Sequence, residues 1–163
     1  VTWALEAILP KVWQHCPQAR FAVAGYAMPT EWSQRWPDPR IEWHGFVADL
    51  AQLQQQSSIF LAPLRHGGGS KLKVLEALAA GLPLVSTEQG ASGLDLHDAQ
   101  QACLGESPEV LSQALIELLG NPERARQMGE CGRHYIQCTH DWNAAADQLQ
   151  AVYQQLQENA VCA

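Results

Sequence analysis

Residues Leu61–Val85 read LAPLRHGGGSKLKVLEALAAGLPLV, and this stretch decides the fold. The stretch begins at the end of an apolar run over 59–62, which is typical of a short buried strand. Strong helix formers then occupy 72–80 and stop at Gly81, where a left-handed C-terminal cap is expected. A second apolar run over 83–86 predicts the next strand. The stretch is therefore a strand, a glycine-rich loop, a helix and another strand.

The charge at the start of this helix has the wrong sign for an ordinary helix. Ser70 is the expected N-cap, and the first turn should favour acidic residues because its free amide groups carry partial positive charge. Instead, no Asp or Glu lies between Asp49 and Glu76. The residues around the helix start are basic, namely Arg65, His66, Lys71 and Lys73. Each cation there that lacks a negative partner destabilises the helix by roughly 0.3–1 kcal/mol.

An anionic ligand on the glycine loop would neutralise the positive charge and would explain why the loop contains three glycines. Glycines let backbone amides approach phosphate oxygens, and the helix start and lysines supply countercharge. We therefore predict a phosphate site formed by Arg65, His66, Gly67, Gly68, Gly69, Ser70, Lys71 and Lys73. The alternative is a plain turn with solvated lysines, which explains one Gly and one Lys but explains the whole cluster poorly.

Other phosphate-binding motifs fit this loop badly. A P-loop places its Ser or Thr after the lysine, whereas Ser70 precedes Lys71. The dinucleotide fingerprint needs a third glycine at the position of Leu72, so the sequence disfavours a nicotinamide cofactor.

Glu76 is the second informative residue of the helix. The helical periodicity gives an apolar arc of Leu72, Val74, Leu75, Leu78 and Ala79, with Glu76 at its edge, one turn from the loop. A carboxylate just beyond a phosphate site can accept two hydrogen bonds from a ribose diol. An ordinary surface pair with Lys73 explains the same spacing equally well.

These residues also carry a family resemblance. The run from Pro63 to Thr87, followed by Gly90 and Gly93-Leu94, resembles the donor-binding half of retaining glycosyltransferases of the GT-B fold, family 4, over essentially the whole chain. The resemblance implies that the glycine loop and helix start hold the diphosphate of a nucleotide sugar and that Glu76 binds the ribose. It also implies that backbone groups of the loop at Gly45 and Phe46 meet the base, where a simple strand-to-helix turn is nearly as good an explanation.

One residue departs from the family pattern. Many members carry a second Glu, which holds sugar hydroxyls, at the position of Gly68. The sugar is therefore not predicted, and no catalytic residue is assigned. A divalent metal and a cofactor are not expected, because no Asp-x-Asp pair is present.

Length and composition bound the remaining possibilities. The 163 residues, 47% hydrophobic and 17% charged, predict one globular domain over 1–163. A net charge of −7 argues against nucleic acid or an anionic membrane as a partner. Five cysteines without a Cys-x-x-Cys pair indicate neither a disulfide framework nor a thiolate metal site, so we expect a cytoplasmic protein. Cys131 and Cys138 are expected to be buried.

The rest of the chain alternates strands with helices, which predicts a Rossmann-like, doubly wound parallel sheet. Further strands are expected over 21–24, 41–44 and 102–104. Helices are expected over 1–16, where Pro10 should kink or shorten the helix, and over 49–57, which Asp49 can cap. Two more are expected from Ser107, a clean helix start, to Gly120, and from Asn121 onwards with an interruption near Gly129 and Gly132. The apolar stripe of the last helix, Trp142, Leu149, Val152, Tyr153 and Leu156, is assigned to core packing.

The chain begins on a helix, whereas a domain of the resembling family begins on a central strand. We therefore expect that strand and the acceptor-binding half to lie upstream of this chain. The expected partners are thus the nucleotide sugar and the acceptor-binding half of the same protein. Any membrane association is expected only through that half. Three classes of function stay open: the donor domain of a glycosyltransferase, half of a nucleotide-sugar epimerase, and a non-catalytic nucleotide-sugar-binding module.

Overall fold

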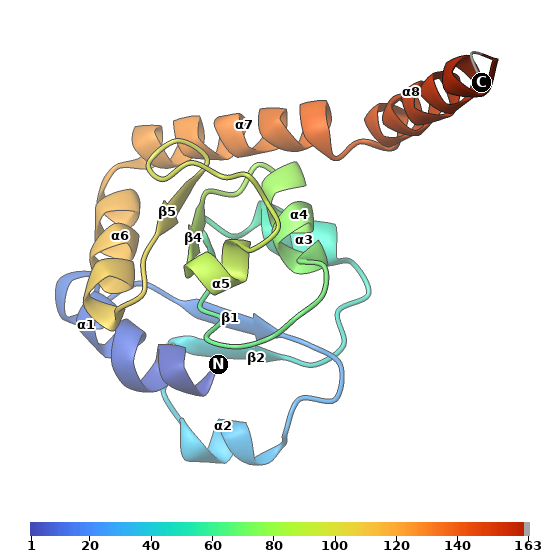
Figure 1. Ribbon diagram of the computed structural model, residues 1–163. Helices are drawn as coiled ribbons and strands as arrows, with labels where there is room; N and C mark the ends of the chain where they lie inside the picture. The colour runs from blue at the N-terminus through green and yellow to red at the C-terminus, as the bar shows by residue number, and fades with distance from the viewer. Residues whose placement is uncertain (162–163) are drawn as a thin grey trace.

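The computed structural model describes the backbone of residues 1–161 (Figure 1). Its strands are β1 (Phe21–Ala24), β2 (Ile41–His44), β3 (Phe60–Ala62), β4 (Leu84–Ser86) and β5 (Ala102–Leu104). Its helices are α1 (Leu9–His15), α2 (Glu31–Arg35), α3 (Leu50–Gln55), α4 (Leu72–Ala79), α5 (Glu88–Ala91), α6 (Pro108–Gly120), α7 (Pro122–Thr139) and α8 (Trp142–Val161), with a π-helical segment η1 (Ala4–Ile8) before α1. Every predicted strand is therefore present within one residue of its expected bounds.

The strands are parallel but form two hydrogen-bonded sheets. β1 pairs with β2, with Phe21 opposite Ile41, and β4 lies between β3 and β5 in a three-stranded sheet. The prediction of parallel strands is confirmed. Within the described residues, no ladder joins β1 to β3.

Helices cover both faces of the three-stranded sheet, as expected for a doubly wound fold. Val85 on β4 packs in one cluster with Ile8, Val12 and Leu111 of η1, α1 and α6. Its neighbour Leu84 points to the other face, because side chains alternate along a strand, and packs with α4 and α7. Phe21 of β1 packs against the first cluster, which joins the two sheets through side chains.

The predicted first helix is present as a π-helical segment, η1, followed directly by α1. Pro10 lies in the first turn of α1, where a missing amide hydrogen costs little, and the turn before it widens into the π-helical η1. Asp49 and Ser107 cap α3 and α6 by accepting from the backbone amides of Gln52 and Val110, as predicted.

α7 is continuous, so the predicted interruption near Gly129 and Gly132 is wrong. These glycines are packing sites for α4. A Cβ on Gly129 would overlap the backbone carbonyl of Gly81, and a Cβ on Gly132 would lie 2.7 Å from Cδ2 of Leu78. Gly81 itself has a φ of 80° just after α4, as expected for a C-terminal cap.

Two burial predictions are also wrong. Cys131 and Cys138 are exposed, because α7 turns that face away from the sheet. The apolar stripe of α8 is exposed as well, and Trp142 retains 89% of its accessible surface. Figure 1 shows α8 projecting away from the rest of the structure, so the stripe does not contribute to the core. Among the described residues, no helix is long and apolar enough to cross a membrane.

We predict that Gly129→Ala lowers the free energy of unfolding by about 1–3 kcal/mol, the usual cost of overpacking. Alanine favours a helix by at most about 1 kcal/mol over glycine, which does not offset a clash with backbone. The measurement is urea denaturation. Gly120→Ala is the matched control, because a Cβ there meets nothing within 4 Å. Equal stability of the two variants would show that α7 can shift away from Gly81.

Candidate functional site

The glycine loop lies at the carboxyl edge of the three-stranded sheet, between β3 and α4. Its backbone uses conformations that glycine adopts most readily, with a φ of 135° at Gly67 and 77° at Gly69. Side chains and backbone are exposed from Arg65 to Ser70. The loop is thus held in a special conformation and remains open to solvent, as a binding loop requires.

Lys71 is buried at the end of this loop. It is only 5% exposed, and its Nζ lies 3.4 Å from the carbonyl oxygen of Gly67, a long hydrogen bond. It occupies the N-cap position of α4 and makes no side-chain cap, so the prediction of Ser70 as N-cap is wrong. Burying an ammonium group without a carboxylate is unfavourable, so Lys71 is not held in this position by an ion pair that stabilises the fold.

Other cations surround the loop. The guanidinium of Arg65 lies 5.6 Å from the ring centre of Trp3, close enough for a cation–π contact. Lys73 is exposed in the first turn of α4. The contact of Trp3 with Arg65 places the segment before η1 beside the glycine loop.

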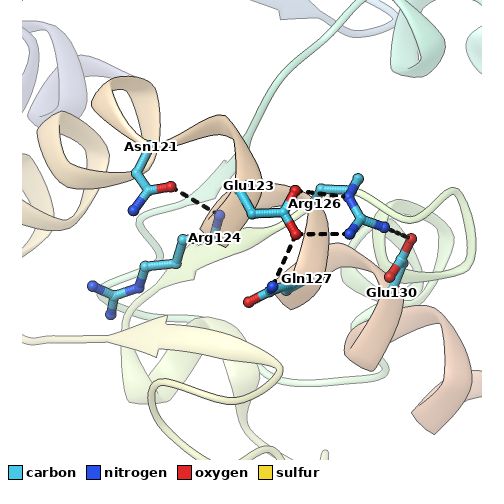
Figure 2. Close-up of polar contacts among 6 residues, drawn as sticks. All are labelled: Asn121, Glu123, Arg124, Arg126, Gln127 and Glu130. Atoms are coloured by element: carbon cyan, nitrogen blue, oxygen red, sulfur yellow. Dashed lines mark hydrogen bonds and ion pairs between the residues drawn. The ribbon is translucent and has the colours of Figure 1, made fainter.

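Most basic side chains elsewhere have acidic partners. Six of the ten Lys and Arg residues form ion pairs, namely Lys11, Arg20, Arg35, Arg40, Arg124 and Arg126. Figure 2 shows the densest example, where Arg126 binds both Glu123 and Glu130, and Arg126 and then Gln127 hold the pKa of Glu123 below its usual range. Among the side chains described, the Lys and Arg residues outside such pairs are Arg65, Lys71, Lys73 and Arg133. Three of these four belong to the glycine loop and the first turn of α4.

Glu76 is exposed on α4, and among the described side chains it forms no ion pair with Lys73. The simple surface pair that explained its spacing equally well is therefore not formed, which leaves the carboxylate free to accept hydrogen bonds. The expected apolar arc of α4 is narrower than predicted, because Leu72 is 62% exposed and Ala79 is also on the surface.

Gly45 and Phe46 follow β2, at the carboxyl end of the other sheet. Phe46 is 76% exposed and meets the ring of Tyr26 edge to face at 6.5 Å between ring centres. Gly25 donates its backbone amide hydrogen to the carbonyl of Gly45 at 3.2 Å, and both glycines line a surface hollow of about 380 Å³. The structure therefore provides exposed backbone and aromatic surface at the predicted base-contacting loop.

Hydroxyl groups at the end of β4 bind the end of β3, just before the glycine loop. Ser86 donates to the carbonyl of Ala62 at 3.0 Å, and Thr87 donates to the carbonyl of Leu64 at 2.5 Å. Sequence reasoning missed both residues and Trp3. Two hydroxyl side chains directly after a buried strand were the available signal for Ser86 and Thr87, whereas nothing in the sequence placed Trp3 beside Arg65.

A sequence profile described as "Glycosyl transferases group 1" matches residues 1–121, about three quarters of the chain. The chain belongs to this family. A GDP-mannose-dependent monoacylated alpha-(1-6)-phosphatidylinositol monomannoside mannosyltransferase of Corynebacterium glutamicum is 30% identical over 122 residues, which are 71% of this chain and 31% of that protein. A related mannosyltransferase of Mycolicibacterium smegmatis is 26% identical over 156 residues, 86% of this chain and 41% of that protein.

Solved structures agree with the family assignment. Sucrose-phosphate synthase from Thermosynechococcus elongatus has a TM-score of 0.76 at 22% identity, over 96% of this chain and 43% of that one. HepE of Anabaena, solved with UDP-glucose, has a TM-score of 0.71 at 16% identity, over 95% and 46% of the two chains. This member of the glycosyl transferases group 1 family thus has the Rossmann-like α/β fold of the C-terminal half of a GT-B glycosyltransferase. It spans less than half the length of these relatives.

In this group 1 chain, two adjacent loop glycines should respond differently to alanine. We predict that Gly69→Ala lowers stability by about 1 kcal/mol, because its φ of 77° strains any residue with a Cβ. Gly68→Ala is the matched control, since an added Cβ meets nothing within 4 Å at either position and Gly68 lacks a positive φ. Thermal denaturation measures both variants. The assigned conformation of the loop would be wrong if Gly68→Ala were the more damaging.

Proposed function

We propose that this chain is the donor-binding half of a retaining, family 4 glycosyltransferase. In this proposal the whole protein transfers a sugar from a nucleotide diphosphate sugar to an acceptor, in polysaccharide or glycoconjugate synthesis. The mannosyltransferase relatives are GDP-mannose-dependent by name, and HepE was solved with UDP-glucose, which supports a nucleotide sugar as the class of donor. The base and the sugar are left unassigned.

The observation that carries the proposal is the group of cations without acidic partners at the glycine loop. Lys71 is buried without a carboxylate, Lys73 lies in the first turn of α4, and Arg65 lies in the loop before it. A diphosphate would supply the missing negative charge, and the exposed amides of the loop would donate to its oxygens. In this proposal the cations of the loop supply the countercharge, so we expect no metal requirement.

The remaining residues extend the site from phosphate to nucleoside. Glu76 lies one turn along α4 and is free to accept from the two ribose hydroxyls. Gly45 and Phe46 are assigned to the base, on the exposed loop after β2. His66 and Ser70 lie exposed in the glycine loop, from which they can reach the phosphates or the sugar.

The two separate sheets support a further part of the proposal, that another strand completes the domain. β1 and β3 each carry a ladder on one edge within the described residues, and both strands are parallel to their partners. A parallel strand between them would join all strands into one sheet. We assign this strand, and the acceptor-binding half, to parts of the protein beyond these 163 residues.

We predict that Lys71→Met weakens binding of nucleoside diphosphates about ten- to a hundredfold in the full-length protein, because a charge-assisted hydrogen bond contributes roughly 1.5–3 kcal/mol. The same change should leave the melting temperature equal or higher, since methionine fills a similar volume without burying a charge. Calorimetry with UDP, GDP and ADP, followed by their sugars, measures the affinity. Binding should persist in the presence of a chelator.

Lys73→Ala and Glu76→Ala should each weaken binding to a similar degree with little change in stability, because both side chains are exposed. Lys11→Ala is the matched control, because it removes a positive charge that is paired with Glu109 on α6. Unchanged affinity in Lys71→Met, Lys73→Ala and Glu76→Ala together would refute the site. An equal loss in Lys11→Ala would show that the effect is general electrostatics.

We also predict that the 163 residues alone bind the donor weakly and do not transfer sugar, because the acceptor surface belongs to the other half. Mass spectrometry of the glycosylated acceptor separates transfer from donor hydrolysis and from epimerisation of the sugar. A Glu76→Ala preparation of the full-length protein controls for contaminating enzyme. Transfer by the isolated chain at the rate of the full-length protein would contradict the two-domain reading.

A further inference from the structure

A residue outside the predicted site contacts the glycine loop directly. Gln89, in the short helix α5 after β4, donates from its Nε2 to the carbonyl oxygen of Gly67 at 2.5 Å. Lys71 donates to the same oxygen at 3.4 Å. One carbonyl of the loop therefore receives a short bond from a neutral amide and a long bond from a buried cation.

Gln89 is well placed to hold this carbonyl because α5 itself is fixed against β3. The backbone amide of Gly90 donates to Oγ1 of Thr87 at 3.0 Å, and Thr87 in turn donates to the carbonyl of Leu64. A Cβ on Gly90 would overlap Oγ of Ser86 and lie 2.5 Å from the carbonyl of Ala62. This close approach leaves α5 little freedom to move relative to the end of β3.

Holding the carbonyl of Gly67 also orients the next amide. A trans peptide is planar, so its C=O and the following N–H point in opposite directions. With the carbonyl of Gly67 turned to Gln89, the N–H of Gly68 points away from α5. Gly68 is exposed, so an amide hydrogen on the side of the peptide opposite Gln89 is accessible to a ligand.

The two bonds to Gly67 would respond differently to an anion. The long bond from Lys71 is weak, and its ammonium gains more from a phosphate oxygen than from a carbonyl. The amide of Gln89 has no charge to draw it away, and its backbone is fixed. When Lys71 turns towards the anion, Gln89 becomes the donor that keeps the Gly67–Gly68 peptide in place.

We propose that Gln89 is a positioning residue of the diphosphate site, which orients the Gly67–Gly68 peptide so that the Gly68 amide donates to a phosphate oxygen. This inference rests on the proposed function. Gln89 contacts the loop and not the ligand, and a phosphate oxygen is the proposed partner of the Gly68 amide.

Gln89→Met tests the proposal, because it keeps the length of the side chain and removes the donor. With inorganic pyrophosphate and UDP as probes of the full-length protein, we expect about two- to tenfold weaker binding, the effect of losing one neutral hydrogen bond. The dependence of the affinity on salt should be unchanged, since no charge is removed, whereas Lys73→Ala should make it shallower. Gln127→Met is the matched control, because it removes a similar amide bond to Glu123 on α7.

A second measurement reports the loop itself. With nitrogen-15-labelled glycine, the Gly68 amide resonance should shift when pyrophosphate is added to the unaltered protein. In Gln89→Met the same resonance should already be displaced or broadened without ligand, and in Gln127→Met it should be unchanged.

The outcomes separate this inference from the proposed function. Binding and a Gly68 resonance unchanged by Gln89→Met, in a protein that does bind the probes, would overturn the role of Gln89 alone. An equal loss of affinity in Gln127→Met would overturn it as well. Failure of the unaltered protein to bind pyrophosphate or any nucleoside diphosphate would overturn both proposals.

Discussion

The buried ammonium group of Lys71 is the constraint around which the site is arranged. A cation that is 95% removed from solvent and held by one long hydrogen bond raises the energy of the unliganded protein. The fold tolerates this because the surrounding structure is firmly fixed: α4 ends at the cap Gly81 and packs against the glycines of α7, and the end of β3 is hydrogen-bonded to Ser86 and Thr87 at the end of β4. The surrounding packing thus supplies stability, and the buried charge of Lys71 reduces it, a division expected if Lys71 is the binding residue that we propose.

The features that depend only on neighbouring residues in the chain could be predicted from the sequence. Strand bounds, the caps at Asp49 and Ser107, and the left-handed Gly81 follow from residue chemistry within a few positions, and all are observed. The charge reversal at the start of α4 was equally visible, because a helix start with lysines and no acid is unfavourable whatever surrounds it.

The errors arose where the answer depends on what packs against a helix. Gly129 and Gly132 looked like helix breakers, yet they are the contact surface for Gly81 and Leu78. The stripe of α8 has the spacing of a core helix and lies exposed, because periodicity shows that a face is apolar without showing what covers it. Gln89 could not be found in the same way, since its partner is 22 residues away and a single glutamine carries no pattern.

The helices pack unequally on the two sheets of the described residues. The three-stranded sheet, with the glycine loop, is packed by helices on both faces, whereas α2 and α3, which follow β1 and β2, bury no residue completely. Local opening should therefore concentrate around β1 and β2, the side that carries Gly45 and Phe46. In the proposed site, the phosphate end of a nucleotide would meet an ordered surface, whereas the base end would have to restrict the motion of a more mobile one. Part of the favourable contact energy of the base would then be offset by lost conformational entropy, so that discrimination among bases would be weaker than the aromatic surface alone suggests.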